Sequence, residues 1–575
     1  MYILYMTAIT SCGIYSLSIL LYTIALAFIC PKLMRKDKYA VAVFLCILPA
    51  LSAAVHFTIN GKITFWAYKY LYLESVMPLL MVIPGKKKVF LSAKSIVSIF
   101  ATLGTCAYFI LLATASPMVH NYTRYSYTES FKKMLGTLED EYCLNSWKKI
   151  DYESLLKEYL PKVEEAEKNH DEAAYAAVVN EVTYRFYDSH VRTDISSKEI
   201  GIKTCEYFAG NDYGLSMIRT DDGKVIAICV ESEGGFIYEE PSDLNELGIH
   251  NGTEITSWDG QDIHDAINDT ECIFPGLQFP VKSNEDVFRP LFLAGKGGEN
   301  VEITFIDDDG NEKSARLKKL GTYDDRLTCS LIRLLHTNTD YPNFYYKMID
   351  ERCGYLYISE ENFDMLSDNI AVARKGYYPK LVKYYADIIE ELKAQGMEYL
   401  VVDIRDNSGG YDNVAGALAS LFTEEKKDMV SLGYEDESGY HITENHYIFP
   451  DGRYKELPVA VLVNANCMSA GDGMAKFLGE CQNVTLMGIT ASGGVNQNNG
   501  GYIYLTENIS VEYPVFLSLS PEGVPLIDTD YTRENKIPLD INIPVTKENA
   551  LRLFSMDGED IELEYAVHYL EENQN

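Results

Sequence analysis

The sequence lacks the short motifs that mark many metal- and nucleotide-dependent enzymes. It has no H-E-x-x-H motif, no G-x-x-x-x-G-K-S/T phosphate loop and no convincing G-x-G-x-x-G turn. Its 12 cysteines include no C-x-x-C pair, so their spacing indicates neither a zinc site nor a disulfide framework. We therefore expect no metal and no cofactor.

Positive charge is scarce after the first 117 residues. The 575-residue chain has a formal net charge of −34, yet residues 1–117 carry ten Lys or Arg and only two Asp or Glu. The strongly acidic remainder would repel phosphate backbones, so nucleic acid is excluded as an expected partner. The hydrophobic content of 47% and the aromatic content of 12% are ample for folded cores and argue against disorder.

Charged residues are absent from three long runs near the N-terminus, at 1–31, 39–61 and 95–123. Each is longer than the roughly 20 residues that cross a bilayer as a helix. A weaker candidate lies at about 64–84. Any one run could be a buried core helix, but together they predict an all-α transmembrane region at 1–120, with membrane lipid as a partner.

Basic residues flank these runs in two clusters, and basic loops stay in the cytoplasm. Lys32, Arg35, Lys36 and Lys38 follow the first run, and Lys86, Lys87, Lys88 and Lys94 precede the last. Both clusters can lie inside only if the weak segment also spans. Four helices then predict a multi-pass cell-membrane protein whose large domain is extracytoplasmic.

The next region, about 125–195, is predicted to be a helical lead-in. Apolar residues recur at helical spacing over 147–159 and 171–186. The sequence Asp188-Ser189-His190-Val191-Arg192 then breaks the pattern.

Residues 200–320 have the pattern of a small β-rich domain. Short β-like runs at 225–230, 253–258 and 301–306 alternate with Asp-Gly turns.

Residues 321–575 alternate between helix and strand patterns. Leu381 to Leu392 present one apolar helical face, and this helix should stop at Gly396. The runs at 399–405 and 459–463 are apolar almost throughout, as expected of buried strands. This pattern predicts an α/β core.

The first segment that could take part in catalysis follows the predicted strand at 399–405. It reads Asp403-Ile404-Arg405-Asp406-Asn407-Ser408-Gly409-Gly410. Two glycines leave backbone N–H groups unshielded, which suits an oxyanion hole. An ordinary strand-to-helix turn has the same pattern.

The second segment follows the strand at 459–463. It runs through small residues to Ser469, at the start of a short predicted helix that ends near Gly479. Taken alone, Ser469 fits an N-cap, because Asp472 lies three residues further on, as in a capping arrangement.

Together the two segments resemble the tail-specific, or C-terminal processing, serine peptidases. That family has D-x-R-x-N-x-G-G followed by a strand and S-A-x-E/D, and the resemblance covers about 190–550. It implies a crotonase-like α/β peptidase core at 321–575. It also implies Ser469 as the nucleophile, with oxyanion donors among the amides of Gly409 or Gly410 and Ala470.

The β-rich region at 200–320 resembles the PDZ-like insert of the same family. Tyr213-Gly214-Leu215-Ser216 is similar to a PDZ carboxylate-binding loop. Asn251-Gly252-Thr253 departs from the Gly-Asp that the family usually has in a later turn. A PDZ domain binds an extended peptide by adding it to a sheet edge, and the alternative is a generic small β domain.

A serine nucleophile needs a general base at neutral pH. One branch of the family supplies a lysine within T-x-G-K-G-x-x-Q. The corresponding stretch here, 490–497, has Gly493 at the lysine position and retains Gln497 as a supporting residue. A Ser/Lys dyad is therefore not expected.

A second, tricorn-like branch uses Ser-His-Glu, with the histidine in a D-x-H sequence after the N-terminal helices. Asp188-Ser189-His190 matches that pattern, and the stretch beginning at Glu534 resembles the glutamate region more loosely. The resemblance implies a triad of Ser469, His190 and Glu534. His190 could instead cap a helix end, and Glu534 could be a surface carboxylate.

The resulting hypothesis is a membrane-anchored serine endopeptidase that hydrolyses peptide bonds of extracytoplasmic proteins or tails. The competing hypothesis is a catalytically inactive, peptide-binding homologue with the same fold.

Overall fold

The computed structural model describes residues 17–30, 32–33, 38, 40–49, 78–79, 99–100, 102–103, 119–230, 244–336, 342–361, 379–436, 438–555 and 558–573. The chain divides into two compact units, Met1–Val119 and His120–Asn575. The four regions predicted from the sequence, at 1–120, 125–195, 200–320 and 321–575, stay predictions.

In the first unit, residues 17–30 and 40–49 are helical. The two segments pack together through a small cluster in which Cys30 and Cys46 are buried.

The membrane prediction is corrected by these helices. Among the residues that the structure describes, no helix is both long and apolar enough to cross a bilayer. Four transmembrane helices and a multi-pass cell-membrane location are therefore not supported. Most of the predicted spans at 64–84 and 95–123 lies outside the described residues.

The second unit begins with a helical layer. Its helices are α5 (Tyr127–Glu141), α6 (Asn145–Lys148), α7 (Tyr152–Asn169), α8 (Glu172–Tyr184) and α9 (Lys198–Ala209). The sequence pattern predicts one helix from 147 to 159, but the chain breaks at Lys149, which has a left-handed φ of 54°. Asp151 then caps α7 by accepting a hydrogen bond from the Ser154 amide at 3.0 Å.

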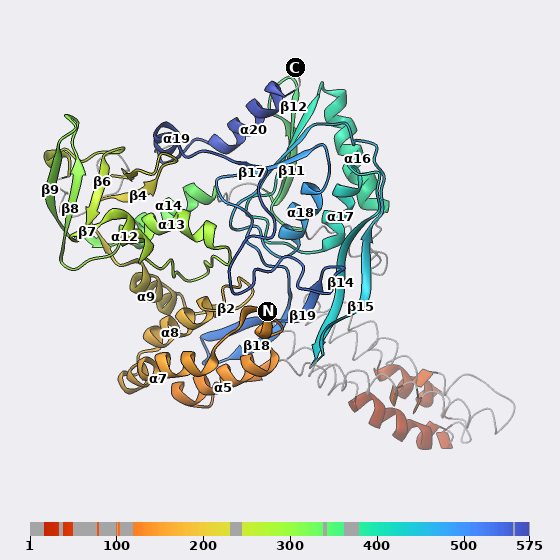
Figure 1. Cartoon of the computed structure of the whole chain (residues 1–575). Helices are drawn as coiled ribbons and strands as arrows, with labels where there is room; N and C mark the ends of the chain where they lie inside the picture. Colours follow the sequence, from red (N-terminus) through yellow and green to blue (C-terminus); the bar gives the residue numbers. More distant parts are fainter. Residues whose placement is uncertain are drawn as a thin grey trace. The chain divides into compact units, whose positions relative to one another are not determined.

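An antiparallel sheet follows, in the order β4-β5-β6-β8-β9, with β7 paired to β6. Its strands are β4 (Ser216–Arg219), β5 (Val225–Ile228), β6 (Glu254–Trp258), β7 (Gln261–Asp262), β8 (Asn300–Ile306) and β9 (Glu312–Lys318). Its helices are α11 (Leu244–Leu247), α12 (Ile263–Asn268), α13 (Lys282–Leu293) and α14 (Asp324–Leu335). A separate pair joins β3 (Asn211–Asp212) to β10 (Gly321–Thr322). Figure 1 shows β4 and β6–β9 gathered on the left.

The central sheet has the order β11-β12-β13-β16-β17-β20, and all its pairs are parallel except β11 with β12. Its strands are β11 (Phe344–Met348), β12 (Cys353–Ile358), β13 (Tyr399–Asp403), β16 (Val459–Leu462), β17 (Val484–Gly488) and β20 (Ile541–Asn542). Its helices are α16 (Pro379–Ala394), α17 (Asp412–Ser420), α18 (Ala470–Gly479), α19 (Lys547–Leu553) and α20 (Ile561–Glu572).

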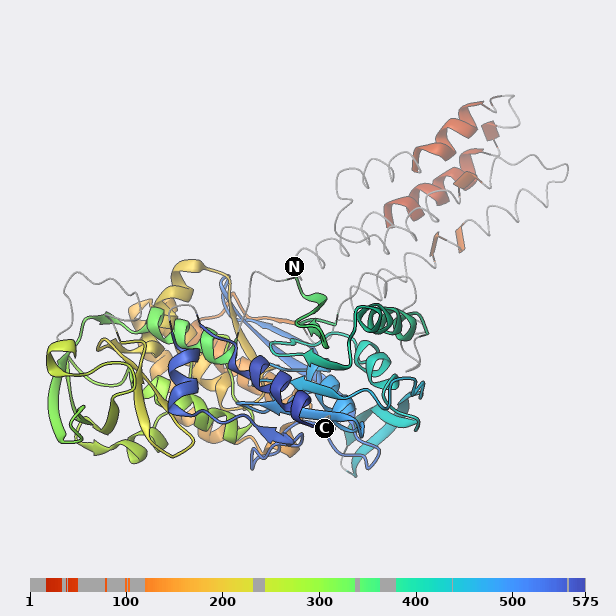
Figure 2. The ribbon, with the colours of Figure 1, turned by 90° about the horizontal axis from the view of Figure 1, so that it is seen from above.

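Alternate residues of β13 pack in two different hydrophobic clusters. Leu400 and Val402 of β13 pack in the cluster that contains α16, α17 and α18. Tyr399 and Val401 pack in the cluster that contains α20. Both faces are therefore covered, which explains why the strand sequences are apolar throughout. Figure 2 shows α16 and the dark blue α20 on different sides of the strands.

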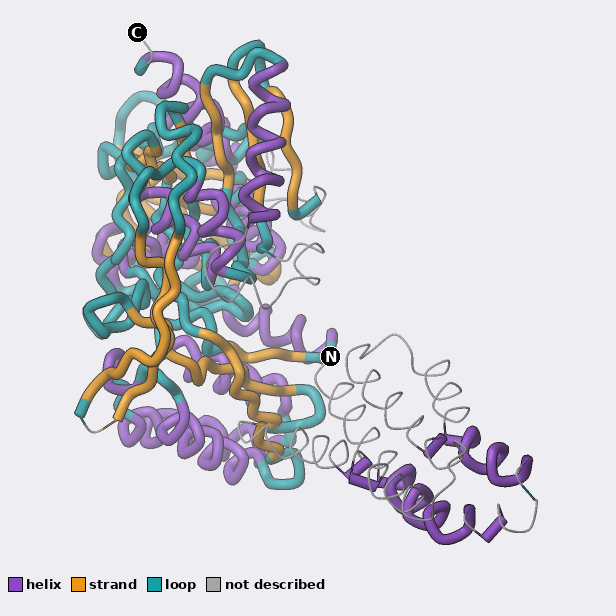
Figure 3. Tube along the Cα trace, turned by 90° about the vertical axis from the view of Figure 1, so that its right-hand side faces the viewer, coloured by secondary structure: helices purple, strands orange, loops and turns teal. Residues whose placement is uncertain are grey.

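A third sheet has the order β1-β18-β19-β14-β15, with β2 paired to β19. Its strands are β1 (Val119–Asn121), β2 (Arg192–Ile195), β14 (Lys427–Asp436), β15 (Gly439–Ile448), β18 (Asn498–Tyr504) and β19 (Ile509–Leu519). The pairing of Arg192 with Glu512 brings the segment after α8 against the C-terminal half of the chain. Figure 3 shows helices and strands interleaved through this unit. The predicted α/β character is confirmed, and the strands and helices that carry the two glycines and Ser469 form where the sequence predicts them.

Candidate active site

Ser469 lies in a sharp turn between β16 and α18. Its backbone has φ 59° and ψ −131°, a conformation that non-glycine residues rarely adopt and that is strained. The backbone is held by two bonds: Ser469 N donates to Val495 O at 2.8 Å, and Gly473 N donates to Ser469 O at 3.1 Å. The side chain makes no capping hydrogen bond to α18, so this structure does not use Ser469 as a side-chain N-cap.

Gly409 lies directly against this serine. A β-carbon at position 409 would lie 2.7 Å from Ser469 Cβ and 2.8 Å from Ala470 N, and its φ of 87° also favours glycine. The Gly409 amide donates to Asn407 Oδ1 at 2.8 Å. Of the predicted oxyanion donors, Gly410 and Ala470 are therefore favoured over Gly409; Ala470 opens α18, where amides lack an intrahelical acceptor.

Replacing Gly409 with Ala should lower kcat/KM for a peptide substrate by about 100-fold or more, the scale of a lost oxyanion donor. The new methyl group would displace Ser469 or cover the Ala470 amide, because both lie under 3 Å from it. The measurement is peptide cleavage alongside a thermal unfolding curve. Gly136→Ala is the control, since a β-carbon there meets nothing within 4 Å. Parental kcat/KM in a folded Gly409→Ala variant would contradict the proximity of Gly409 to the chemistry.

The segment from Thr490 to Gln497 holds the nucleophile turn in place and has no room for a lysine. A β-carbon at Gly493 would lie 2.4 Å from Cys467 O. The next lysine along the helix, Lys476, is ion-paired with Glu480. Neither position supplies a base to Ser469.

Asp472 and Asp528 anchor the end of this segment. Val495 N donates to Asp472 Oδ2 at 2.9 Å, and burial raises the pKa of Asp472 to about 7. Asn496 N lies 3.2 Å from each Asp528 carboxylate oxygen. Gln497 donates its side-chain amide to Asp528 and accepts from Ser518 N at 2.6 Å, and its supporting role stays a prediction.

Asp528 is a residue that the sequence pattern did not single out. It is fully buried. Burial raises its pKa to about 6, with a further contribution from the charge of Asp188, while Lys148, Gln497 and His190 oppose the shift. The only sequence signal is its position directly after the apolar run Pro525-Leu526-Ile527, which predicts that the carboxylate is drawn into the core.

His190 is buried, with 3% of its surface exposed, beside the carboxylate of Asp188. His190 N donates to Asp188 Oδ1 at 2.9 Å, and His190 Nδ1 lies 3.5 Å from the same oxygen. Tyr142 Oη donates to the other oxygen, Asp188 Oδ2, at 2.8 Å. Burial opposes ionisation of Asp188, but His190 and Lys148 outweigh it and lower the pKa of this carboxyl.

A cavity of about 280 Å³ joins the two halves of the site. Ser189, the neighbour of His190, lines it together with Ser408, the neighbour of Gly409, and Met468, the neighbour of Ser469. Its other lining residues are Asn180, Tyr184, Arg192, Thr193, Gly276, Leu277, Gln278, Asp406, Ala465 and Asn466. The segments carrying the predicted nucleophile, base and glycines therefore open onto one cavity.

Glu534, the predicted third member, has an exposed side chain. The described contacts of Glu534 and His190 include no hydrogen bond or ion pair between the two. Asp528 is buried and interacts electrostatically with His190, so it fits the carboxylate role better than the exposed Glu534.

The predicted carboxylate-binding loop, Tyr213 to Ser216, is buried. Gly214 N donates to Asp212 Oδ1 at 2.7 Å, Tyr213 Oη donates to Gly298 O at 2.7 Å, and Ser216 Oγ lies 2.6 Å from Tyr323 Oη. The Gly214 amide is thus already hydrogen-bonded to a carboxylate of the chain itself. Peptide binding by this loop stays a prediction.

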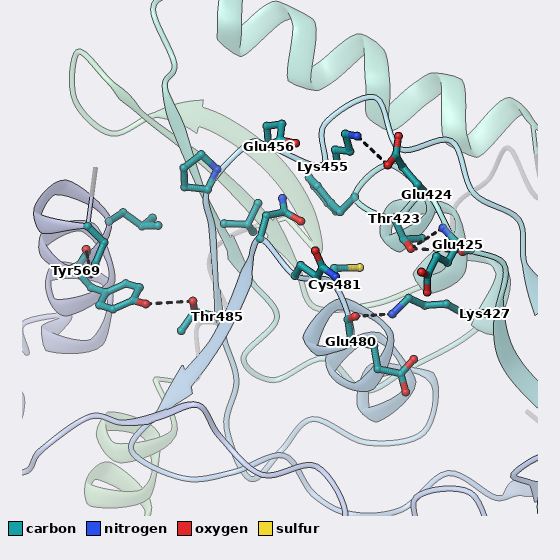
Figure 4. Close-up of a pocket in the computed structure, with 17 residues that line it drawn as sticks. Thr423, Glu424, Glu425, Lys427, Lys455, Glu456, Glu480, Cys481, Thr485 and Tyr569 are labelled. Atoms are coloured by element: carbon teal, nitrogen blue, oxygen red, sulfur yellow. Dashed lines mark hydrogen bonds and ion pairs between the residues drawn. The ribbon is translucent and has the colours of Figure 1, made fainter. Parts of the chain in front are cut away.

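A larger cavity, of about 700 Å³, lies at the opposite end of the central sheet, around the start of β16 (Figure 4). Its wall includes the ion pair of Lys455 with Glu424, and a hydrogen bond between Thr485 Oγ1 and Tyr569 Oη at 3.3 Å. None of the predicted catalytic residues lines it. Within the described residues, no group of three or more His, Cys, Asp or Glu side chains is arranged to hold a metal ion.

The strained serine turn, the glycine beside it and the buried histidine–carboxylate pair lie on segments whose neighbouring residues line one cavity, an arrangement that fits a serine hydrolase. Residues 354–537 match the family model for peptidase family S41. The chain therefore contains a peptidase family S41 domain, and this match supports the family of tail-specific or C-terminal processing peptidases.

Individual relatives are more distant. The chain is 31% identical over 111 residues to the carboxy-terminal processing protease CtpA of Bacillus subtilis (strain 168), which is 19% of this chain. The aligned stretch spans only about a quarter (23%) of that relative's length.

The chain is also similar to solved structures, among them mature CPAF complexed with lactacystin, at 14% identity and a TM-score of 0.44 over 78% of this chain and 97% of that chain. The photosystem II D1 C-terminal processing protease matches at 16% identity and a TM-score of 0.32, over 75% of this chain and 96% of that chain.

Proposed function

We propose that the protein is an endopeptidase that hydrolyses peptide bonds in proteins or their C-terminal tails, with Ser469 as nucleophile and His190 as general base. The observation that carries the proposal is the strained backbone of Ser469 against Gly409, since strain of this kind persists where it serves function. The match of residues 354–537 to peptidase family S41 supports protein or peptide substrates.

The chemistry follows the two-step scheme of serine peptidases. Neutral His190 accepts the hydroxyl proton of Ser469 as Oγ attacks the scissile carbonyl carbon. The amides of Gly410 and Ala470 stabilise the oxyanion. His190 then donates the proton to the leaving amine, and water hydrolyses the acyl-enzyme by the same steps in reverse. Asp188 and Asp528 stabilise the transient imidazolium.

We assign the third catalytic role to Asp528 and expect Asp528→Asn to reduce kcat/KM by about 100-fold or more, because its charge stabilises the imidazolium. Glu534→Gln, the matched control, should stay within about twofold, since its side chain is exposed. The pKa of about 6 means that Asp528 is ionised above that pH and protonated below it, so parental activity should fall as the pH drops through 6. The assignment fails if Glu534→Gln shows the larger loss in peptide-cleavage assays.

Two structural parts of the proposal follow the family pattern. The covered parallel sheet supports a crotonase-like core over 321–575. The sheet over 200–320, in which β4 is an edge strand, supports a PDZ-like domain that receives substrate tails by strand addition.

The test is incubation of the full chain with long unstructured peptides, followed by mass spectrometry of the products. We expect internal cleavage that a serine-directed fluorophosphonate abolishes. Peptides that bind, by fluorescence anisotropy, yet stay intact from pH 5 to pH 9 would favour the inactive peptide-binding homologue instead.

A further inference from the structure

A buried lysine lies next to the proposed general base. Lys148 ends the short helix α6 and has only 6% of its surface exposed. Its ammonium donates to Tyr187 O and to Thr529 Oγ1, both at 2.9 Å. Tyr187 precedes Asp188 and Thr529 follows Asp528 along the chain, so one cation joins the two loops that carry the buried carboxylates.

The corner between α5 and α6 contacts both loops at further points. Tyr142, at the end of α5, donates its hydroxyl to Asp188 Oδ2 at 2.8 Å. Trp147, beside Lys148, donates its indole N–H to Asp528 O at 3.0 Å. The N-terminal helices therefore hold the Asp188 loop and the Asp528 loop in register with each other.

This arrangement addresses an electrostatic problem. Asp188 and Asp528 both interact with His190, and the charge of Asp188 adds to burial in raising the pKa of Asp528. Asp528 must be ionised to stabilise the imidazolium that forms when His190 accepts the serine proton. A nearby cation favours that ionised form.

Lys148 interacts with both carboxylates. Burial lowers the pKa of Lys148, while the charges of Asp188 and Asp528 raise it again. The other ionisable groups that interact with this cluster include Tyr142 and Cys143 from the α5 corner, Tyr440 of β15, Asp472 of α18, and Asp530 and Arg533 from the loop after Asp528. Arg533 is itself ion-paired with Glu285 at 2.7 Å.

We propose that Lys148 is a positioning residue: a buried counter-ion that clamps the Asp188 and Asp528 loops together and offsets their negative charge beside the general base. The role rests on the proposed function. Through Lys148, the helical region before the peptidase core would contribute to the active site.

The experiment measures the second-order rate of fluorophosphonate labelling of the full chain from pH 5 to pH 9. Lys148→Met keeps most of the side-chain volume but removes the charge. The acid limb of its pH profile should move up by about one pH unit, the scale of a nearby charge, which makes labelling roughly tenfold slower on the acid side. Two variants that retain a positive charge, Lys148→Arg and the control Thr529→Val, should keep the acid limb of the parent.

The proposal is overturned if folded Lys148→Met has the same acid limb in its pH profile as the parent, whatever its loss in labelling rate. An equal shift in Thr529→Val overturns it too, because a lost hydrogen bond would then explain the shift. If neither Lys148→Met nor Lys148→Gln folds, the role is structural and the proposal is wrong. A parent that is not labelled at any pH overturns the proposed function itself.

Discussion

Ser469→Ala should abolish peptide cleavage, with a loss of about 10⁵- to 10⁶-fold in kcat and no loss of fold. Removing the nucleophile of a serine peptidase leaves only the rate that the oxyanion donors and substrate binding supply. Alanine can take the same backbone conformation that serine takes here, at φ 59°. The side chain makes no hydrogen bond that caps α18, so the unfolding temperature should change little.

Substrate binding should survive this substitution, because the 280 Å³ cavity is lined by Ser408 and Met468 rather than by Ser469. The measurements are product formation over days and peptide affinity by fluorescence anisotropy. Cleavage by Ser469→Ala at more than about one hundredth of the parental rate would exclude Ser469 as nucleophile.

His190→Ala should cost about 10⁴-fold or more in kcat, the scale of losing the base of a serine triad. His190 has only 3% of its surface exposed, and its backbone amide binds Asp188. We therefore add His190→Gln, which retains most of the volume, and check both variants by thermal unfolding.

The competing base is Lys148, the buried lysine bonded beside both Asp188 and Asp528. A folded His190→Ala variant with parental activity, together with a dead Lys148→Met variant, would assign the base to the lysine. Loss of activity in the histidine variants, with a shifted but active Lys148→Met variant, would assign the base to His190 and the counter-ion role to Lys148.

The features that sequence alone predicts are local ones. The strand at Tyr399–Asp403, the double glycine at 409 and 410, and the helix that starts after Ser469 each follow from a continuous apolar run and the residues next to it. The position of His190 could be predicted only through the family pattern. Its approach to the core depends on the pairing of β2 with β19, which joins segments about 320 residues apart.

Asp528 and Lys148 show what the sequence could not reveal. A carboxylate and an ammonium become buried together only because α6, the loop after α8 and the loop after β19 converge. Glu534 has the better sequence context but an exposed side chain. The membrane prediction rests on long uncharged runs, and among the described residues no helix is long and apolar enough to cross a bilayer.

The most direct measurement is identification of the residue that a fluorophosphonate modifies in the full chain, by digestion and mass spectrometry. We expect one adduct, on Ser469, that is absent in Ser469→Ala and forms about 10⁴-fold more slowly in folded His190→Ala. An adduct on another serine, or unchanged labelling of Ser469 without His190, would contradict the assignment of nucleophile and base.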